Sequence, residues 1–296
     1  MKKNFYLVTG GAGFIGTNLI CRLLKEGHRI ASFDNYSTGL KENEQNGCEY
    51  FDVDLSKTKD YEFLDCKPDA IFHLAALARI EPSFDYPDET FEYNVNGTLN
   101  MLEYARKHNI KFVYAGSSSY HGGVYENPYT YTKWQGEELC KLYSKVYGMD
   151  TVICRFYNVY GPYQITEGAY SAIVGIFQRQ YSENQPLTIT GDGEQRRDFT
   201  HVDDIVEGII KSSLFISKKE DVFELGSGKN YSINELADMF GEDYPKKYLP
   251  HRDGEMRTTL CDISSAKQKI NYVPTRDLKE YISNWANKNK KNISQS

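Results

Sequence analysis

Short apolar runs alternate with amphipathic segments through the first half of the chain. The segment Phe14–Glu26 carries Ile15, Leu19 and Leu23 at helical spacing, and Gly27 follows it as a predicted helix C-cap. Short apolar runs joined by helices are typical of parallel strands that are buried on both faces. The pattern therefore predicts an α/β fold with a Rossmann-like doubly wound parallel sheet. The predicted strands are Phe5–Val8, Ile30–Phe33, Ala70–Leu74, Phe112–Ala115 and Val152–Phe156.

The second half of the chain is less regular. Further strands are predicted at Phe199–Val202 and Val222–Leu225. A helix is predicted at Ser232–Phe240, because Ser232 suits its N-cap. The polar tail from Asn287 is expected to fray.

No low-complexity linker separates the two halves. We therefore expect a smaller C-terminal domain that is interleaved with the sheet rather than strung after it. In this division residues 1–162, with returning segments at about 198–228, form the sheet domain. Residues 163–296 form mainly the smaller domain.

Composition and charge exclude several classes of protein. The chain has 296 residues and a formal net charge of −6, whereas a general nucleic-acid binder is usually basic. No segment approaches the roughly 18 apolar residues of a membrane span, so we expect no membrane partner. The cysteines are scattered without a C-x-x-C pair, which indicates reduced thiols, a cytoplasmic protein and no metal site. They are Cys21, Cys48, Cys66, Cys140, Cys154 and Cys261.

A glycine-rich segment follows the first predicted strand and opens the first predicted helix. Its Gly10, Gly13 and Gly16 have the spacing G-x-x-G-x-x-G. Glycines let the backbone turn tightly and approach a pyrophosphate, and the helix N-terminus supplies free N–H groups and partial positive charge. With a strand before it and a helix after it, the motif predicts a dinucleotide site.

Two aspartates near strand ends bear on which dinucleotide binds. Asp34 ends the second predicted strand, 18 residues after Gly16. A carboxylate there can accept both ribose hydroxyls of the adenosine and repels the extra phosphate of NADP, so the predicted cofactor is NAD. Asp54 follows the next strand-like run and is a weaker candidate for a hydrogen bond to the adenine.

Tyr129 and Lys133 lie four residues apart in a predicted amphipathic helix and therefore share one face. Tyrosine is a poor base at its free pKa of about 10. A nearby ammonium and the positive charge of a nicotinamide favour the phenolate, which can take a proton from a substrate hydroxyl while a hydride leaves for NAD. The cluster Ser117–Ser119 follows the strand Phe112–Ala115, so one of its hydroxyls can share that proton with Tyr129.

Together with further motifs, these residues resemble the extended short-chain dehydrogenase/reductase family, in its nucleotide-sugar epimerase/dehydratase branch. The resemblance covers nearly the whole chain. It implies a sheet-based NAD domain and a smaller substrate-binding domain, and we expect a homodimer. The further motifs are His73–Ala76, Asn94–Thr98, Arg155–Pro162, Arg197–Asp204 and Arg252–Glu255.

The resemblance also assigns roles to single residues. It implies that Ser117, Tyr129 and Lys133 are the catalytic group, and that Tyr129 and Lys133 also contact the cofactor. The resemblance also implies cofactor contacts beyond the residues already named, which are Gly10, Gly13, Gly16, Asp34 and Asp54. The further contacts are Phe14, Ile15, Asn35, Leu74, Ala75 and Ala76.

On the substrate side, the resemblance implies that Asn158, Arg197 and Arg252 hold a diphosphate. Arginine forks suit phosphate oxygens, which makes these roles physically reasonable. The seventh residue after Arg252 is Thr259, and the resemblance implies that this small residue lies near the C2 substituent of the sugar and admits N-acetyl groups. The remaining expected substrate contacts are Ser118 and Ser119.

The resemblance leaves the reaction to be chosen. Dehydratases of the family carry Asp-Glu directly after the catalytic threonine, but Ser118 and Ser119 stand there in this chain. Reductive members prefer NADP, which Asp34 disfavours. The favoured function is therefore an NAD-dependent 4-epimerase that acts on a UDP-hexose or UDP-N-acetylhexosamine through a 4-keto intermediate.

Two alternatives stay open. One is a nucleotide-sugar 4,6-dehydratase or another oxidative enzyme of the branch that uses different acid and base residues. The other is a non-catalytic protein that binds NAD or a sugar nucleotide. Only 11 residues separate Ser117 from Tyr129, fewer than is usual in the family, so we expect a more open substrate pocket.

Overall fold

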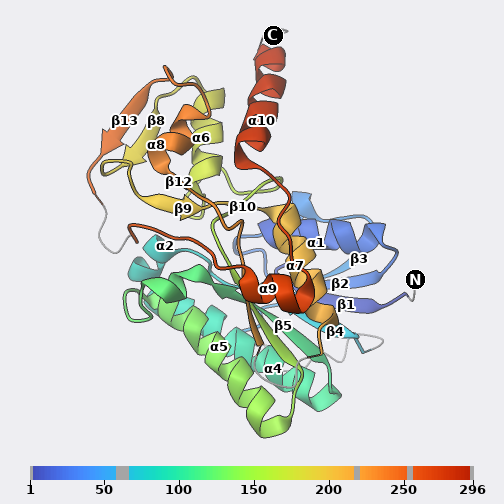
Figure 1. The fold of residues 1–296 in the computed structure, drawn as a ribbon. Helices are drawn as coiled ribbons and strands as arrows, with labels where there is room; N and C mark the ends of the chain where they lie inside the picture. Colours follow the sequence, from blue (N-terminus) through green and yellow to red (C-terminus); the bar gives the residue numbers. More distant parts are fainter. Residues whose placement is uncertain (1–2, 58–66, 217–220, 252–255, 294–296) are drawn as a thin grey trace.

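A seven-stranded parallel sheet forms the centre of the molecule (Figure 1). The computed structural model describes residues 3–57, 67–216, 221–251 and 256–293. The sheet has the order β11-β6-β5-β4-β1-β2-β3, so the chain leaves β1 toward one edge and returns to fill the other. This is the doubly wound arrangement that the sequence predicts. The strands are β1 (Phe5–Thr9), β2 (Arg29–Asp34), β3 (Cys48–Asp52), β4 (Ala70–His73), β5 (Lys111–Ser117), β6 (Thr151–Phe156) and β11 (Asp221–Leu225).

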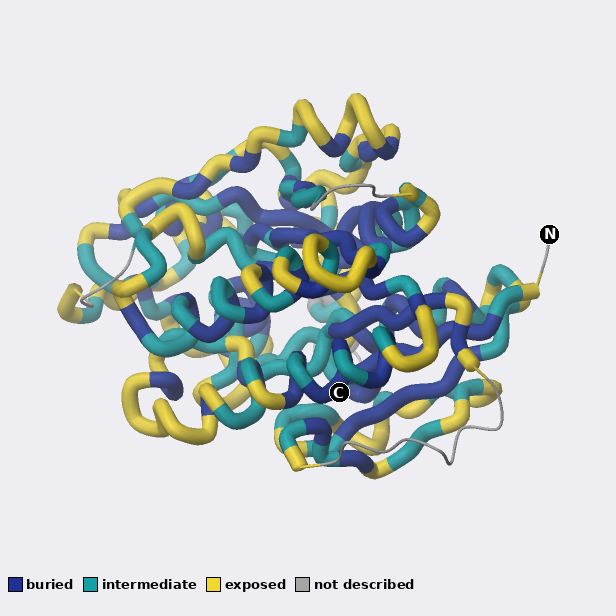
Figure 2. The backbone as a smooth tube through the Cα atoms, turned by 90° about the horizontal axis from the view of Figure 1, so that it is seen from below, coloured by how far each residue is buried: buried dark blue, intermediate teal, exposed yellow. Residues whose placement is uncertain are grey.

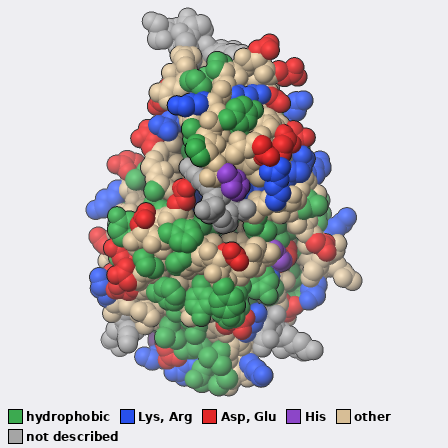
Figure 3. All heavy atoms as spheres, turned by 90° about the vertical axis from the view of Figure 1, so that its left-hand side faces the viewer, with side chains coloured by type: hydrophobic (Ala, Val, Ile, Leu, Met, Phe, Trp, Pro, Cys, Tyr) green, Lys and Arg blue, Asp and Glu red, His purple; other side chains and the backbone are tan. Residues whose placement is uncertain are grey.

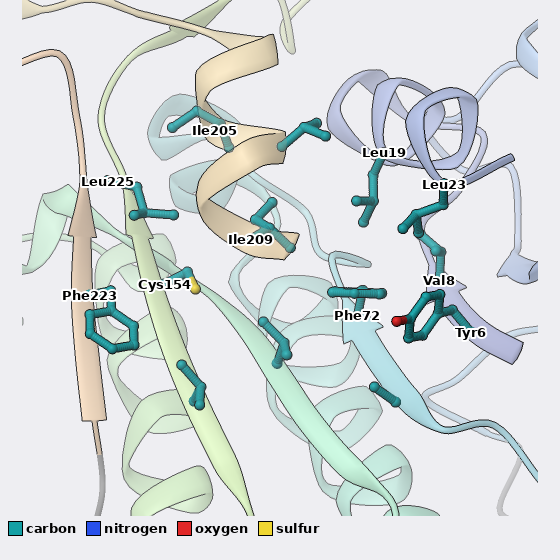
Figure 4. Packing of buried hydrophobic residues seen from close by; sticks show 14 of the residues in the cluster. Tyr6, Val8, Leu19, Leu23, Phe72, Cys154, Ile205, Ile209, Phe223 and Leu225 are labelled. Carbon is teal, nitrogen blue, oxygen red and sulfur yellow. The ribbon is translucent and has the colours of Figure 1, made fainter. Parts of the chain in front are cut away.

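Helices cover both faces of this sheet. Helices α1 (Phe14–Lys25), α7 (Val202–Leu214) and α9 (Ser264–Ile270) pack on one face. Figure 4 shows apolar side chains of α1 and α7 meeting those of the strands. Helices α4 (Gly97–His108) and α5 (Pro128–Tyr147) pack on the other face. The strands are therefore buried on both sides, and Figure 2 shows the exposed residues gathered on loops and outer helix faces.

The C-terminal elements gather around a separate apolar cluster beside the sheet (Figure 1). They include helices α6 (Ile173–Ser182), α8 (Ile233–Asp238) and α10 (Leu278–Ile293), with β8 (Leu187–Thr190) paired to β13 (Lys246–Leu249). Because α7 and β11 return to the sheet domain between these elements, the two parts of the chain are interleaved. The exact boundary near residue 162 stays a prediction.

Short elements link the two parts. Strand β7 (Val159–Tyr160) pairs with β10 (Thr200–His201), and β9 (Arg196–Asp198) pairs with β12 (Asn230–Ser232). Two short helices, α2 (Ile80–Asp85) and α3 (Pro87–Phe91), follow β4.

Two sequence predictions are wrong in their extent. The strand expected at Phe199–Val202 is only β10, because Val202 already begins α7 and the ring of His201 caps that helix by accepting from the backbone N–H of Asp203 at 3.1 Å. The tail from Asn287 is helical and not irregular, since α10 continues to Ile293.

The helix predicted at Ser232–Phe240 is present as α8, although it ends at Asp238. Ser232 and Glu235 form a reciprocal capping box at its start, which satisfies two of the free N–H groups there.

Candidate active site

A cavity of about 570 Å³ lies at the carboxyl end of the parallel sheet. Its lining comes from the glycine loop, the segments after β2, β4, β5 and β6, and residues of the C-terminal part from Gln164 to Ile233. Ligands of doubly wound sheets bind in this crevice, next to the point where strand order reverses. Here that point lies between β1 and β4.

The glycine loop forms one end of this cavity. Gly10 has a φ of +72°, in the left-handed region that favours glycine. A Cβ on Gly16 would lie 2.1 Å from the carbonyl oxygen of Gly10, so only glycine fits this tight turn. Gly13 precedes α1 directly, and Phe14 and Ile15 line the cavity at the helix N-terminus. The bare backbone and free helix end fit a pyrophosphate.

Asp34 lies at the end of β2 beside the glycine loop. Its carboxylate accepts the backbone N–H groups of Ala12 and Tyr36, both at 2.9 Å. These bonds orient the carboxylate at the cavity, which Asn35 also lines. Burial raises the pKa of Asp34 above its ordinary value, although the two hydrogen bonds oppose that rise.

Asp54 is placed differently from the sequence prediction. Its carboxylate accepts from the backbone and the hydroxyl of Ser56, at 3.0 and 2.6 Å, and pairs with Lys57 at 3.2 Å. Its neighbours Val53 and Leu55 line the cavity, but Asp54 does not. The carboxylate of Asp54 therefore closes its own loop, and its hydrogen bond to the adenine stays a prediction.

Leu74, Ala75 and Ala76 line the cavity directly after β4. Behind them, the His73 ring lies 2.9 Å from the hydroxyl of Thr9 and 3.0 Å from that of Thr98. Complete burial lowers the pKa of His73 to about 3, so the ring is neutral. It is a buried bridge between elements and not a proton carrier.

Tyr129 lies in the first turn of α5. Asn127 caps this helix by accepting from the backbone N–H of Thr130 at 2.8 Å, and Pro128 occupies its first position. The hydroxyl of Tyr129 donates to Oγ of Ser117 at 3.3 Å, at the end of β5. This contact brings together the tyrosine and the serine that the resemblance pairs, because a strand end and a helix start meet here. Their catalytic role stays a prediction.

The pKa of Tyr129 is raised by burial, and it is lowered by the Ser117 hydrogen bond and by the charge of Arg79. We expected the ammonium of Lys133 to act on it. Nζ of Lys133 instead lies 4.4 Å from the centre of the Tyr114 ring, and burial lowers the pKa of Lys133 to about 8. Both residues nevertheless line the same cavity.

Ser118 and Ser119 begin a 3₁₀ turn, Ser118–Gly122, and neither lines the cavity. The hydroxyl of Ser119 lies 2.9 Å from that of Ser117. Ser119 therefore supports Ser117, which does not line the cavity either. A substrate contact of Ser118 or Ser119 stays a prediction. The short segment that follows is held by a hydrogen-bond contact of 3.0 Å between Nε2 of His121 and the carboxylate of Glu224.

The predicted diphosphate residues are partly brought together. Asn158 and Arg197 both line the cavity. The Nδ2 group of Asn158 donates to the hydroxyl of Thr259 at 3.3 Å and to the carbonyl of Asp198 at 3.1 Å. Thr259 itself is buried and does not line the cavity, and Arg252 falls outside the described residues, as does Cys66.

Comparison with known proteins identifies the family. A family model described as the NAD dependent epimerase/dehydratase family matches residues 6–226. The chain belongs to this family. Its NAD dependence agrees with the cofactor that Asp34 predicts.

Relatives of this NAD-dependent epimerase/dehydratase match over almost their full length. A putative UDP-glucose 4-epimerase of Methanocaldococcus jannaschii is 33% identical, over 96% of this chain and 98% of that protein. A UDP-glucuronate 4-epimerase of Thermodesulfobacterium geofontis is 33% identical, over 98% of this chain and 97% of that protein. The crystal structure of a UDP-glucose 4-epimerase from Thermotoga maritima with UDP-glucose has a TM-score of 0.89 at 28% identity, covering 98% of this chain and 99% of that chain.

The sequence analysis missed Arg79 and Gln195, which also line the cavity. Arg79 stands in the apolar stretch Leu74–Ile80, directly after a strand that ends at the crevice. A single charge in such a stretch was the signal that could have found it. Gln195 had no comparable signal, because it lies in the turn between β8 and β9, and only the folded chain brings that turn to the cavity.

The described part of the chain shows no group of His, Cys, Asp or Glu that could hold a metal ion. Within that same part, no helix has both the length and the apolar character to cross a membrane. The five described cysteines are all free thiols.

Proposed function

We propose that this protein is a nucleotide-sugar 4-epimerase that acts on a UDP-hexose or UDP-N-acetylhexosamine with NAD as cofactor. The observation that carries the proposal is the contact at 3.3 Å between Ser117 and Tyr129, because Tyr129 lines a cavity that also reaches the glycine loop. A hydroxyl pair at this place can move a proton on and off a sugar bound beside the cofactor.

The cofactor would lie along the carboxyl end of the sheet. Gly10, Gly13 and Gly16 suit the pyrophosphate, and Asp34 suits the adenosine ribose. Phe14, Ile15, Asn35 and Leu74–Ala76 complete its walls. When bound, NAD removes and returns the hydride at C4 of the sugar.

Tyr129 takes the proton of the sugar 4-hydroxyl, and Ser117 shares it. Burial raises the pKa of Tyr129, so the phenolate needs positive charge nearby. Lys133 and the nicotinamide supply it in the complex, since Lys133 lines the same cavity. After the 4-keto sugar turns over, Tyr129 returns the proton to the 4-oxygen, and the hydride from NAD would add to the opposite face of C4.

Asn158 and Arg197, which line the cavity, hold the diphosphate. The resemblance adds Arg252 to them, although Arg252 lies outside the described residues. Thr259 acts through Asn158, because its hydroxyl accepts from that amide and from the backbone N–H of Asp198 at 3.1 Å. It therefore orients a diphosphate contact and is not itself the wall beside C2.

Incubation with UDP-sugars in the presence of NAD tests the proposal. The C4 epimer of the substrate is expected, and Tyr129→Phe should lose about 10²–10⁴-fold in rate while NAD binding persists. The matched control is Tyr131→Phe, two residues along α5, whose ring packs among aromatic neighbours at the surface. A 4-keto-6-deoxy product would indicate the dehydratase instead, and binding without any product would indicate the non-catalytic protein.

We also propose a homodimer in the cytoplasm. Helix α5 exposes Leu142, Val146 and Tyr147, and Figure 3 shows hydrophobic side chains gathered on the side of the molecule where α5 lies in Figure 1. A second copy would cover this apolar face. The free thiols suit a reducing compartment. Sedimentation velocity tests the assembly, and a monomer at every concentration would contradict it.

A further inference from the structure

Arg79 lies at the start of α2, where the segment after β4 enters the cavity. Its Nε donates to the backbone carbonyl of Tyr170 at 2.8 Å, and Tyr170 also lines the cavity. This bond fixes one edge of the guanidinium. The two terminal nitrogens form no hydrogen bond with any residue in the described ranges.

The charge of Arg79 also lacks a carboxylate partner among those residues. Glu81 lines the cavity too and has an interaction of its own, but no ion pair joins it to Arg79. Arg155, by contrast, is buried with two carboxylates, those of Glu137 and Glu224. A part-buried guanidinium without a counter-charge is unfavourable, so its retention in a cavity points to an anionic ligand.

The position of Arg79 near Tyr129 indicates which part of the nucleotide sugar carries the anionic group. The hydroxyl of Ser83, in the same helix α2, accepts from the backbone N–H of Tyr129 at 3.1 Å, which ties the start of α5 to α2. The charge of Arg79 is close enough to Tyr129 to lower the pKa of its hydroxyl. Arg79 therefore faces the reacting sugar.

We propose that Arg79 binds a carboxylate carried by the sugar ring, so that this protein prefers acidic sugars among nucleotide sugars. This inference rests on the proposed function, because it places the sugar at Tyr129. The fork of terminal nitrogens suits a carboxylate, which can accept both of them at once. Because Nε is bonded to the carbonyl of Tyr170, the two terminal nitrogens are left to bind a ligand.

Binding to the NAD-loaded protein tests this preference by calorimetry. Two acidic probes carry the carboxylate at different places, UDP-glucuronate at C6 and UDP-N-acetylmuramate on the C3 substituent. UDP-glucose, UDP-N-acetylglucosamine and UDP are the neutral-sugar and sugar-free references. We expect one acidic probe to bind roughly 10–100-fold more tightly than its neutral counterpart, the range of a charged hydrogen-bonded pair.

Arg79→Gln should remove this advantage and leave the neutral sugars and UDP unchanged. Arg79→Lys, which keeps the charge without the fork, should retain only part of it. Arg22→Gln is the matched control, because Arg22 pairs with Glu26 and Glu207 on the outer side of α1 and should bind every probe like wild type. Circular dichroism establishes that each variant is folded.

Three results would overturn the assignment. Equal binding of acidic and neutral sugars by wild type removes the preference itself. An equal loss for all ligands in Arg79→Gln, UDP included, places Arg79 at the diphosphate. Unchanged binding with a lower kcat for every sugar makes Arg79 a positioning residue for Tyr129. Because the readout is binding, absence of any C4 epimer would refute the proposed function without deciding this one.

Discussion

A buried ion pair behind the active site should carry a large share of the stability of α5. Nε and Nη2 of Arg155 donate to the carboxylate of Glu137 at distances of 2.6–3.2 Å, and the two side chains are only 8% and 1% exposed. Removing one partner of a buried pair costs about 3–5 kcal/mol, because the other charge remains buried. Glu224 also pairs with Arg155, at 3.0 Å, so we expect Glu137→Gln to cost about 3 kcal/mol, near the lower end.

Urea unfolding followed by circular dichroism measures this loss, and thermal unfolding should show a fall in Tm of about 6–12 °C. The control is Glu138→Gln, the next residue, which is 46% exposed and pairs with Lys141 at 2.7 Å. An exposed pair is worth less than about 1 kcal/mol, so this variant should stay close to wild type. If the two variants are equally stable, the reasoning about the buried pair is wrong.

The remaining predictions concern the cofactor and the catalytic lysine. Asp34→Ala should weaken NAD binding and reduce discrimination against NADP; titration of the apo-protein with both cofactors measures this, and an unchanged preference would show that another residue reads the ribose. Lys133→Met should abolish most turnover yet raise the free energy of unfolding at neutral pH, because burial lowers the pKa of Lys133 to about 8 and its ammonium destabilises the fold. As pH rises from about 8 toward 10, folded wild type loses this proton before the unfolded chain does, so the free energy of unfolding of wild type increases. The difference in this free energy between Lys133→Met and wild type should therefore narrow in urea unfolding. A difference that stays constant with pH would contradict the lowered pKa.

Local features of the chain were enough for the sheet and for the cofactor end of the site. Apolar runs of strand length, separated by helical periodicity, have only one common solution, a parallel sheet with helices on both faces. Gly10 and Gly16 belong to one turn of seven residues, so their spacing alone predicts the tight backbone that forms there. Asp34 is tied to the same loop through Ala12, which is why its role could be predicted together with the glycines.

The substrate end depended on contacts between distant segments. Thr259 and Asn158 are separated by 101 positions in the chain. Only the folded structure shows that the Thr259 hydroxyl accepts from the Asn158 amide while Thr259 itself does not line the cavity. In the same way, the resemblance could place Thr259 near the sugar by counting from Arg252, but it could not show the direction of the side chain.

The sequence by itself determined the fold class, the cofactor loop and the pairing of Tyr129 with a serine at the end of β5. Each of these follows from short-range spacing and from the rule that parallel strands end at one edge. Tertiary structure alone decided that Ser117 is the serine that meets the tyrosine, with Ser119 bonded to Ser117. It also decided that Arg79 lines the cavity without a carboxylate partner in the described chain. The physical reason is that a side chain's partners and its counter-charge are set by packing between helices, which spacing along one segment does not encode.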